Sequence, residues 1–104
     1  MTLCEGVYGL AGTFPASERY GLTGQLTRAV VSVHANIAEG HARGTKRDYA
    51  HFLAIAQGTL AETETYLLLA VRLKYLAPDD ISAALSLLTE VAKMLSTMRT
   101  RLRS

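Results

Sequence analysis

Apolar residues recur at intervals of three and four along most of the chain, which is the period of a helix that buries one face. The clearest case lies at residues 25–40, where one face carries Leu26, Val30, Val33 and Ile37. A neighbouring face of the same segment is polar and carries Arg28, Ser32, Asn36 and Glu39. We expect a helix over about 22–40 that ends at Gly40, where a residue without a Cβ can adopt a left-handed cap.

The helix expected before this one is weaker. Residues 2–13 have helical spacing of apolar residues, but they include Gly6, Gly9 and Gly12. Each glycine costs a helix about 1 kcal/mol relative to alanine, so this first helix needs neighbours to hold it. A residue that precedes proline avoids the helical region, so Phe14 before Pro15 ends the pattern and 15–21 is a connector.

A long third helix is expected over about 46–75, after a short loop at 41–45. Thr45, followed three residues later by Asp48, is a variant of the capping box that starts a helix. Residues 66–71 are apolar on every side, which a helix covered on only one face does not need. This run predicts burial on more than one side.

The fourth helix begins with a strong start signal at 77–80, where proline suits the first turn and two aspartates complement the helix dipole. Apolar residues then continue in a heptad seam through Ile81, Ala84, Leu88, Val91, Leu95, Met98 and Leu102. Short loops between four helices predict an all-α fold, an antiparallel up-down-up-down four-helix bundle that forms a single domain over 1–104.

Composition fits a packed domain in a reducing compartment. Apolar residues make up 49% of the chain, which favours a folded core over disorder. The only cysteine, Cys4, has no partner for an internal disulfide. No apolar run approaches the roughly 18 residues of a membrane span, and the first residues lack the features of a signal peptide. We therefore expect a cytoplasmic protein with no membrane segment.

The chain offers little for catalysis. Ser32 and His34 are two residues apart on a helix and so do not face each other. No phosphate-binding glycine loop occurs, and no glutamate is followed three residues later by histidine, as it is in di-iron bundles. No recognised spacing of metal ligands joins the three histidines, His34, His41 and His51. We expect no enzymatic activity, no cofactor and no metal.

Two clusters of cations stand out, one around the loop between the second and third helices and one at the end of the chain. In an antiparallel bundle both clusters lie at the same end, and such a basic end can bind phosphate backbones. The alternative is that these cations are solvated or offset helix dipoles. The candidate nucleic-acid-binding residues are Arg43, Lys46, Arg47, Arg99, Arg101 and Arg103.

The polar stripe on the second helix also has two interpretations. Glu39 can pair with Arg43 one turn later, a minor stabilising contact. Alternatively, the stripe meets another helix or another subunit and fixes the register through a satisfied polar network. We favour a structural or assembly role over direct ligand binding for Arg28, Ser32, Asn36, Glu39 and Gly40.

Two motifs carry a family resemblance, F-P-x-x-E-x-Y-G-L at 14–22 and N-I-A-E-G at 36–40. With the segments around them, they resemble the bacterial four-helix bundle proteins encoded in intervening sequences of large-subunit ribosomal RNA genes. The resemblance implies a small bundle that assembles into a ring, commonly a pentamer. Members usually have a longer first helix, whereas only six residues precede Val7 here, so either the start lies further upstream or the first helix is shortened. The matching positions, which look like fold and assembly determinants, are Phe14, Pro15, Glu18, Tyr20, Gly21, Leu22, Arg28, Asn36, Glu39 and Gly40.

A relative of this family, the accessory variability determinant of diversity-generating retroelements, binds nucleic acid and a reverse transcriptase through basic surface. The resemblance therefore implies a non-enzymatic homo-oligomer that binds RNA, DNA or a nucleic-acid-processing protein such as a reverse transcriptase. Thr27 stands where the family usually has a second basic residue before Arg28, which thins the basic surface there. The alternative function is a protein-interaction scaffold that binds no nucleic acid.

Overall fold

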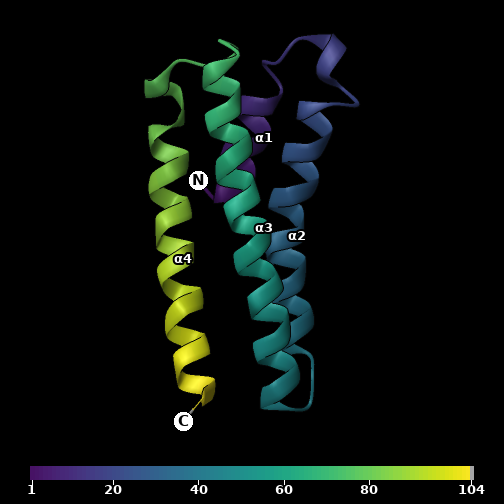
Figure 1. The fold of residues 1–104 in the computed structure, drawn as a ribbon, viewed down its shortest axis with the longest axis vertical. Helices are drawn as coiled ribbons and strands as arrows, with labels where there is room; N and C mark the ends of the chain where they lie inside the picture. The colour runs from purple at the N-terminus through teal and green to yellow at the C-terminus, as the bar shows by residue number, and fades with distance from the viewer. Residues whose placement is uncertain (104) are drawn as a thin grey trace.

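The computed structural model describes residues 1–103 and shows four helices that run alternately up and down a bundle 45 Å long (Figure 1). The described residues contain no strand. The all-α four-helix bundle predicted from the sequence is confirmed. Its elements are α1 (Leu3–Ala11), α2 (Leu22–His41), α3 (Lys46–Arg72) and α4 (Ser82–Arg103), with the 3₁₀ turns η1 (Ala16–Glu18) and η2 (Pro78–Ile81).

The short helix α1 begins with a capping box. The Thr2 hydroxyl accepts a hydrogen bond from the Glu5 backbone N–H at 3.1 Å, and the Glu5 carboxylate accepts one from the Thr2 N–H at 3.0 Å. This reciprocal pair satisfies two backbone donors at the helix start, which offsets part of the cost of the glycines. Because α1 has only nine residues, it covers only the upper part of the bundle (Figure 1).

The core runs the whole length of the bundle, including the part that α1 does not reach. Leu53 of α3, Val33 of α2 and Leu95 of α4 have no exposed surface. The seam predicted on α4 faces this core, with Ile81, Ala84, Leu88 and Leu95 buried. The other members of the seam are only half-buried; they are Val91, Met98 and Leu102.

Gly40 does not cap α2 in a left-handed conformation, and that prediction was wrong. The helix continues through Gly40 to His41, and none of the described glycines has a positive φ. Gly40 is buried instead, and a Cβ there would lie 2.9 Å from the Cβ of Phe52 and 3.0 Å from Cδ1 of Tyr49. Glycine is needed because α3 passes directly against α2 at this point.

The connector between α1 and α2 is held by Glu18. Its carboxylate accepts hydrogen bonds from the Leu22 backbone N–H at 3.0 Å and from the Tyr75 hydroxyl at 2.7 Å. The Leu22 amide and then the Tyr75 hydroxyl hold the pKa of Glu18 below its ordinary value, and the pKa of Tyr75 is raised by the same bond. A Cβ on Gly21 would lie 2.5 Å from this carboxylate, which explains the glycine there.

The third helix ends earlier than predicted, at Arg72 rather than near residue 75. Lys74 adopts the left-handed region with φ of 64°, and the Tyr75 N–H donates to the Ala70 carbonyl at 2.9 Å. This is the hydrogen bond of a Schellman cap, which terminates a helix. The start of α3 is as expected, since the Thr45 hydroxyl accepts from the Asp48 N–H at 3.1 Å.

Within one chain the apolar run at 66–71 is buried on one side only, so burial on a second side stays a prediction for an assembly. Leu67 and Ala70 are fully buried. Leu68 and Leu69 are 48% and 42% exposed. One turn further on, Leu73 is 45% exposed, so the end of α3 leaves an apolar surface uncovered.

Replacing Gly40 with alanine should destabilise the fold, because the added methyl group overpacks the contact with Phe52 and Tyr49 by more than the gain in helix propensity. We expect a net loss of about 1–2 kcal/mol in the free energy of unfolding, measured by urea denaturation. Gly58→Ala is the matched control, since Gly58 is also inside a helix but a Cβ there meets nothing within 4 Å. It should stabilise the fold by up to about 1 kcal/mol. Equal effects of the two substitutions would contradict this account of Gly40.

Glu18→Gln should lower the melting temperature near neutral pH, because a neutral amide replaces the carboxylate that accepts both hydrogen bonds. The pKa of Glu18 is lower in the folded chain than in the unfolded one, so its carboxylate stabilises the fold above the ordinary pKa. That contribution to stability is lost as the pH falls through the lowered pKa of Glu18. The difference in melting temperature between Glu18→Gln and the unmodified chain should therefore become smaller below about pH 4. Glu62→Gln, at an exposed position, serves as the control and should show no such narrowing.

Candidate nucleic-acid interface

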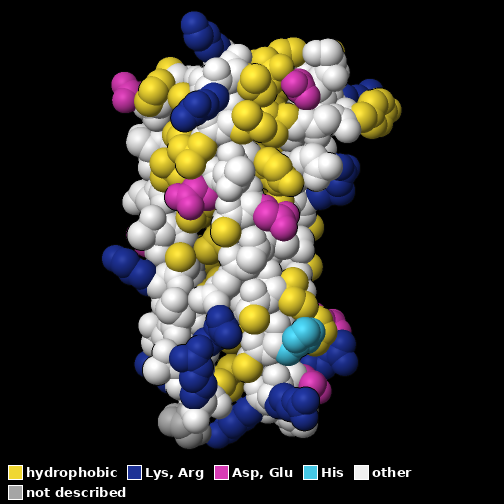
Figure 2. Space-filling view, in the orientation of Figure 1, with side chains coloured by type: hydrophobic (Ala, Val, Ile, Leu, Met, Phe, Trp, Pro, Cys, Tyr) yellow, Lys and Arg dark blue, Asp and Glu magenta, His cyan; other side chains and the backbone are white. Residues whose placement is uncertain are grey.

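The loop between α2 and α3 lies at the same end of the bundle as the C-terminal end of α4, as predicted (Figure 1). Lys and Arg side chains gather at this lower end (Figure 2). We call it the basic end, and of the eleven Lys and Arg residues in the chain it carries Arg43, Lys46, Arg47, Arg99, Arg101 and Arg103. Of the nine carboxylates, only Glu39 and Asp48 come from the same loop and helix ends. The basic end therefore carries a net positive charge.

Arg43 is held by its neighbours in the loop. Its guanidinium pairs with Glu39 one turn earlier and lies over the ring of Phe52, 4.8 Å from the ring centre. His41 packs edge-on against Tyr49 at 5.9 Å. The rings of Phe52 and Tyr49 therefore support the loop. The pairing with Glu39 offsets the charge of Arg43.

Lys46 and Arg47 are exposed and lie in the first turn of α3. This is the positive end of the helix dipole, where a cation costs about 0.3–1 kcal/mol instead of stabilising the helix. Dipole compensation therefore accounts for Arg101 and Arg103 in the last turn of α4, but not for Lys46 and Arg47. An anion beside this turn is attracted by both the side chains and the backbone N–H groups.

Arg99 joins two helices. Its Nη1 donates to Oε1 of Gln57 on α3, and Nε2 of Gln57 donates to the Ser96 hydroxyl at 3.3 Å. The Nε of Arg99 is buried and has no hydrogen-bond partner. Arg99 is thus half-buried between α3 and α4 and less available to a ligand than the exposed Arg103.

The polar stripe on α2 makes only local contacts in the chain. Nδ2 of Asn36 donates to the Ser32 carbonyl at 2.8 Å and to the Ser32 hydroxyl at 2.9 Å. Glu39 forms the pair with Arg43 that the sequence allowed, and Arg28 is exposed. Within residues 1–103 these side chains form no hydrogen bond to another helix, so the structure does not assemble them into an interhelical network.

The 23S rRNA-intervening sequence protein family has a model that matches residues 1–97. The chain belongs to this family. The resemblance found in the sequence motifs is thereby confirmed. None of the curated proteins matches the chain.

The described part of the chain contains no group of three or more His, Cys, Asp or Glu residues that could hold a metal ion. One segment, Pro78–Arg103, is long and apolar enough to cross a membrane, with a mean hydropathy of 1.2. Core helices of soluble proteins pass the same test, so this segment is weak evidence for a membrane.

Proposed function

We propose that this protein is a non-enzymatic, cytoplasmic homo-oligomer that binds the phosphate backbone of RNA or DNA through its basic end. The observation that carries the proposal is the position of Lys46 and Arg47 in the first turn of α3. These cations are unfavourable for the helix itself, and they become favourable when a phosphate lies beside them. The family description names an rRNA sequence, which is compatible with an RNA-related role.

The proposed contact is electrostatic and independent of base sequence. Cations that neutralise phosphates release condensed counterions, which makes the affinity fall steeply with salt. Exposed cations reach the basic end from two separate helices, through Lys46 and Arg47 on α3 and Arg103 on α4. An oligomer would multiply this surface without any new contact within one chain. A nucleic-acid-processing protein such as a reverse transcriptase is a partner that the same cations could contact.

A protein-interaction scaffold is the second candidate function, and one observation favours it. Leu68, Leu69 and Leu73 form an uncovered apolar surface at the end of α3, which we call the α3 apolar face. Hydrophobic side chains gather over the upper part of the view that shows α3 (Figure 2). A second copy of the chain is the occupant we propose, in a ring for which the family resemblance favours a pentamer, and the scaffold function then depends on apolar surface that the ring leaves uncovered.

Reversing two charges in the first turn of α3 should weaken nucleic-acid binding. With Lys46→Glu and Arg47→Glu combined, we expect the affinity for labelled RNA and DNA at low salt to fall by about tenfold or more. The slope of log affinity against log salt should become shallower by about 1.5, since two phosphate contacts are lost. Fluorescence anisotropy over a series of salt concentrations measures both quantities.

The matched control combines Arg72→Glu with Lys74→Glu. It makes the same change of charge at the opposite end of α3. This control should bind as the unmodified chain does. Acidic residues at a helix start stabilise the helix, so unfolding cannot explain a loss of binding in the first variant. The proposal fails if the unmodified chain does not bind below about 100 μM, or if both double variants weaken binding equally.

The α3 apolar face should hold the oligomer together. Light scattering should give several times the 11.3 kDa mass of one chain, and Leu69→Glu should shift the protein to that monomer mass. The reason is that a buried, unpaired carboxylate in the interface costs several kcal/mol. Ser86→Glu, on the exposed side of α4, should leave the mass unchanged. A monomeric unmodified chain at micromolar concentration would rule out the homo-oligomer.

A further inference from the structure

Flat side chains surround the contact between α2 and α3 at Gly40. His41 packs edge-on against Tyr49 with 5.9 Å between the ring centres, and His51 packs edge-on against Phe52 with 5.4 Å. Tyr49 and Phe52 both lie against Gly40, so the two pairs form one cluster across the two helices. This cluster belongs to the basic end, because it surrounds the loop between α2 and α3.

The outer members of the cluster are the two imidazoles. Tyr49 and Phe52 are half-buried, whereas His41 and His51 are exposed. A histidine side chain lies on the surface at the lower end of the view, among hydrophobic, Lys and Arg side chains (Figure 2). A ligand at the basic end therefore meets the imidazole rings first, and each of them is supported by a second ring.

Arg43 adds a third flat group. Its guanidinium lies over Phe52, 4.8 Å from the ring centre, and pairs with Glu39. The pairing offsets its charge, which makes Arg43 a weak contact for phosphate. The same two neighbours hold the guanidinium in place, and the Arg43 side chain is 44% exposed, so a planar surface remains open to a ligand. Guanidinium planes and histidine rings are both groups on which unpaired bases stack.

The cations proposed to bind phosphate lie beside these flat groups. Arg47 and His51 are one turn apart on α3, at the spacing that places two side chains on the same face. His41 ends α2, and Arg43 lies in the loop that leads to Lys46. A strand that places its phosphates on these cations therefore has flat groups within reach of its bases.

We propose that the basic end binds single-stranded nucleic acid, with unpaired bases stacked on His41, Arg43 and His51. This inference rests on the proposed phosphate contact of Lys46 and Arg47, and it names the class of ligand for that contact. In a duplex the base faces are covered by neighbouring base pairs, so only a single strand can use both kinds of contact. The stacking is tolerant of sequence, because every base has a flat face.

The test compares two labelled strands that carry the same charge. One is a deoxyadenylate strand of about 12 nucleotides, and the other is a strand of the same length whose sugars carry no bases. Fluorescence anisotropy should show about tenfold or more tighter binding of the deoxyadenylate strand, because only this strand can stack. The slopes of log affinity against log salt should be equal, since both strands release the same counterions. This comparison uses the unmodified chain and so does not depend on the folding of a variant.

Replacing the flat groups should remove the advantage that the bases give. We expect His41→Ala, His51→Ala and Arg43→Lys each to weaken binding of the deoxyadenylate strand by about fivefold or more. Arg43→Lys keeps the charge and loses the plane. None of the three substitutions should change the affinity for the abasic strand or for a blunt duplex of the same length.

Two further replacements of His51 separate stacking from charge. The quantity compared is the ratio of the affinities for the deoxyadenylate strand and the abasic strand. His51→Tyr retains a ring and should keep this ratio. His51→Lys adds a charge that attracts both strands alike, so it should lower the ratio as His51→Ala does.

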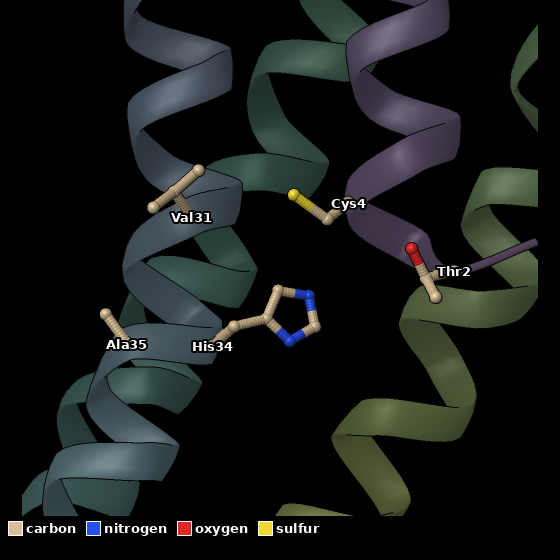
Figure 3. A pocket seen from close by; sticks show the side chains of 5 residues that line it. All are labelled: Thr2, Cys4, Val31, His34 and Ala35. Atoms are coloured by element: carbon tan, nitrogen blue, oxygen red, sulfur yellow. The ribbon is translucent and has the colours of Figure 1, made fainter.

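His34→Ala is the matched control. His34 is exposed, lies on α2 about two turns before His41, and points into a cavity beside the start of α1 (Figure 3). The cavity has a volume of about 510 Å³, and no cation is among its lining residues Thr2, Cys4, Val31, His34 and Ala35. Removing this imidazole should leave both affinities unchanged.

Equal affinities for the deoxyadenylate and abasic strands would overturn the stacking and leave the phosphate contact intact. The stacking is also overturned if His51→Lys keeps the ratio as well as His51→Tyr does, because position 51 then acts by charge. If neither strand binds below about 100 μM at low salt, the proposed function fails, and this inference fails with it.

Discussion

The lower half of the molecule depends on the contact between α2 and α3 at Gly40. Because this residue has no Cβ, Phe52 and Tyr49 of α3 can lie directly against α2. The two helices are therefore close at the point where the chain reverses, and a loop of four residues, 42–45, is enough to join them. Lys46 and Arg47 follow at once on a capped helix start, so the proposed phosphate contact is carried by a stiff element.

The same close pairing explains how the bundle tolerates a short α1. Leu53, Val33 and Leu95 come from three different helices and have no exposed surface, although α1 covers only the upper part of the bundle. The core is closed by α2, α3 and α4, and α1 only has to cover the upper part.

Periodicity was sufficient to predict the helices and the fold, because every long helix buries one continuous stripe. It could not predict the role of Gly40, since a glycine near a helix end fits a left-handed cap and a close helix contact equally well. The end of α3 was missed because lysine rarely adopts the positive φ that Lys74 has. The up-down topology was enough to predict that the cations lie at one end of the bundle. The hydrogen bond between Arg99 and Gln57 joins residues 42 positions apart, and no local sequence pattern predicts it.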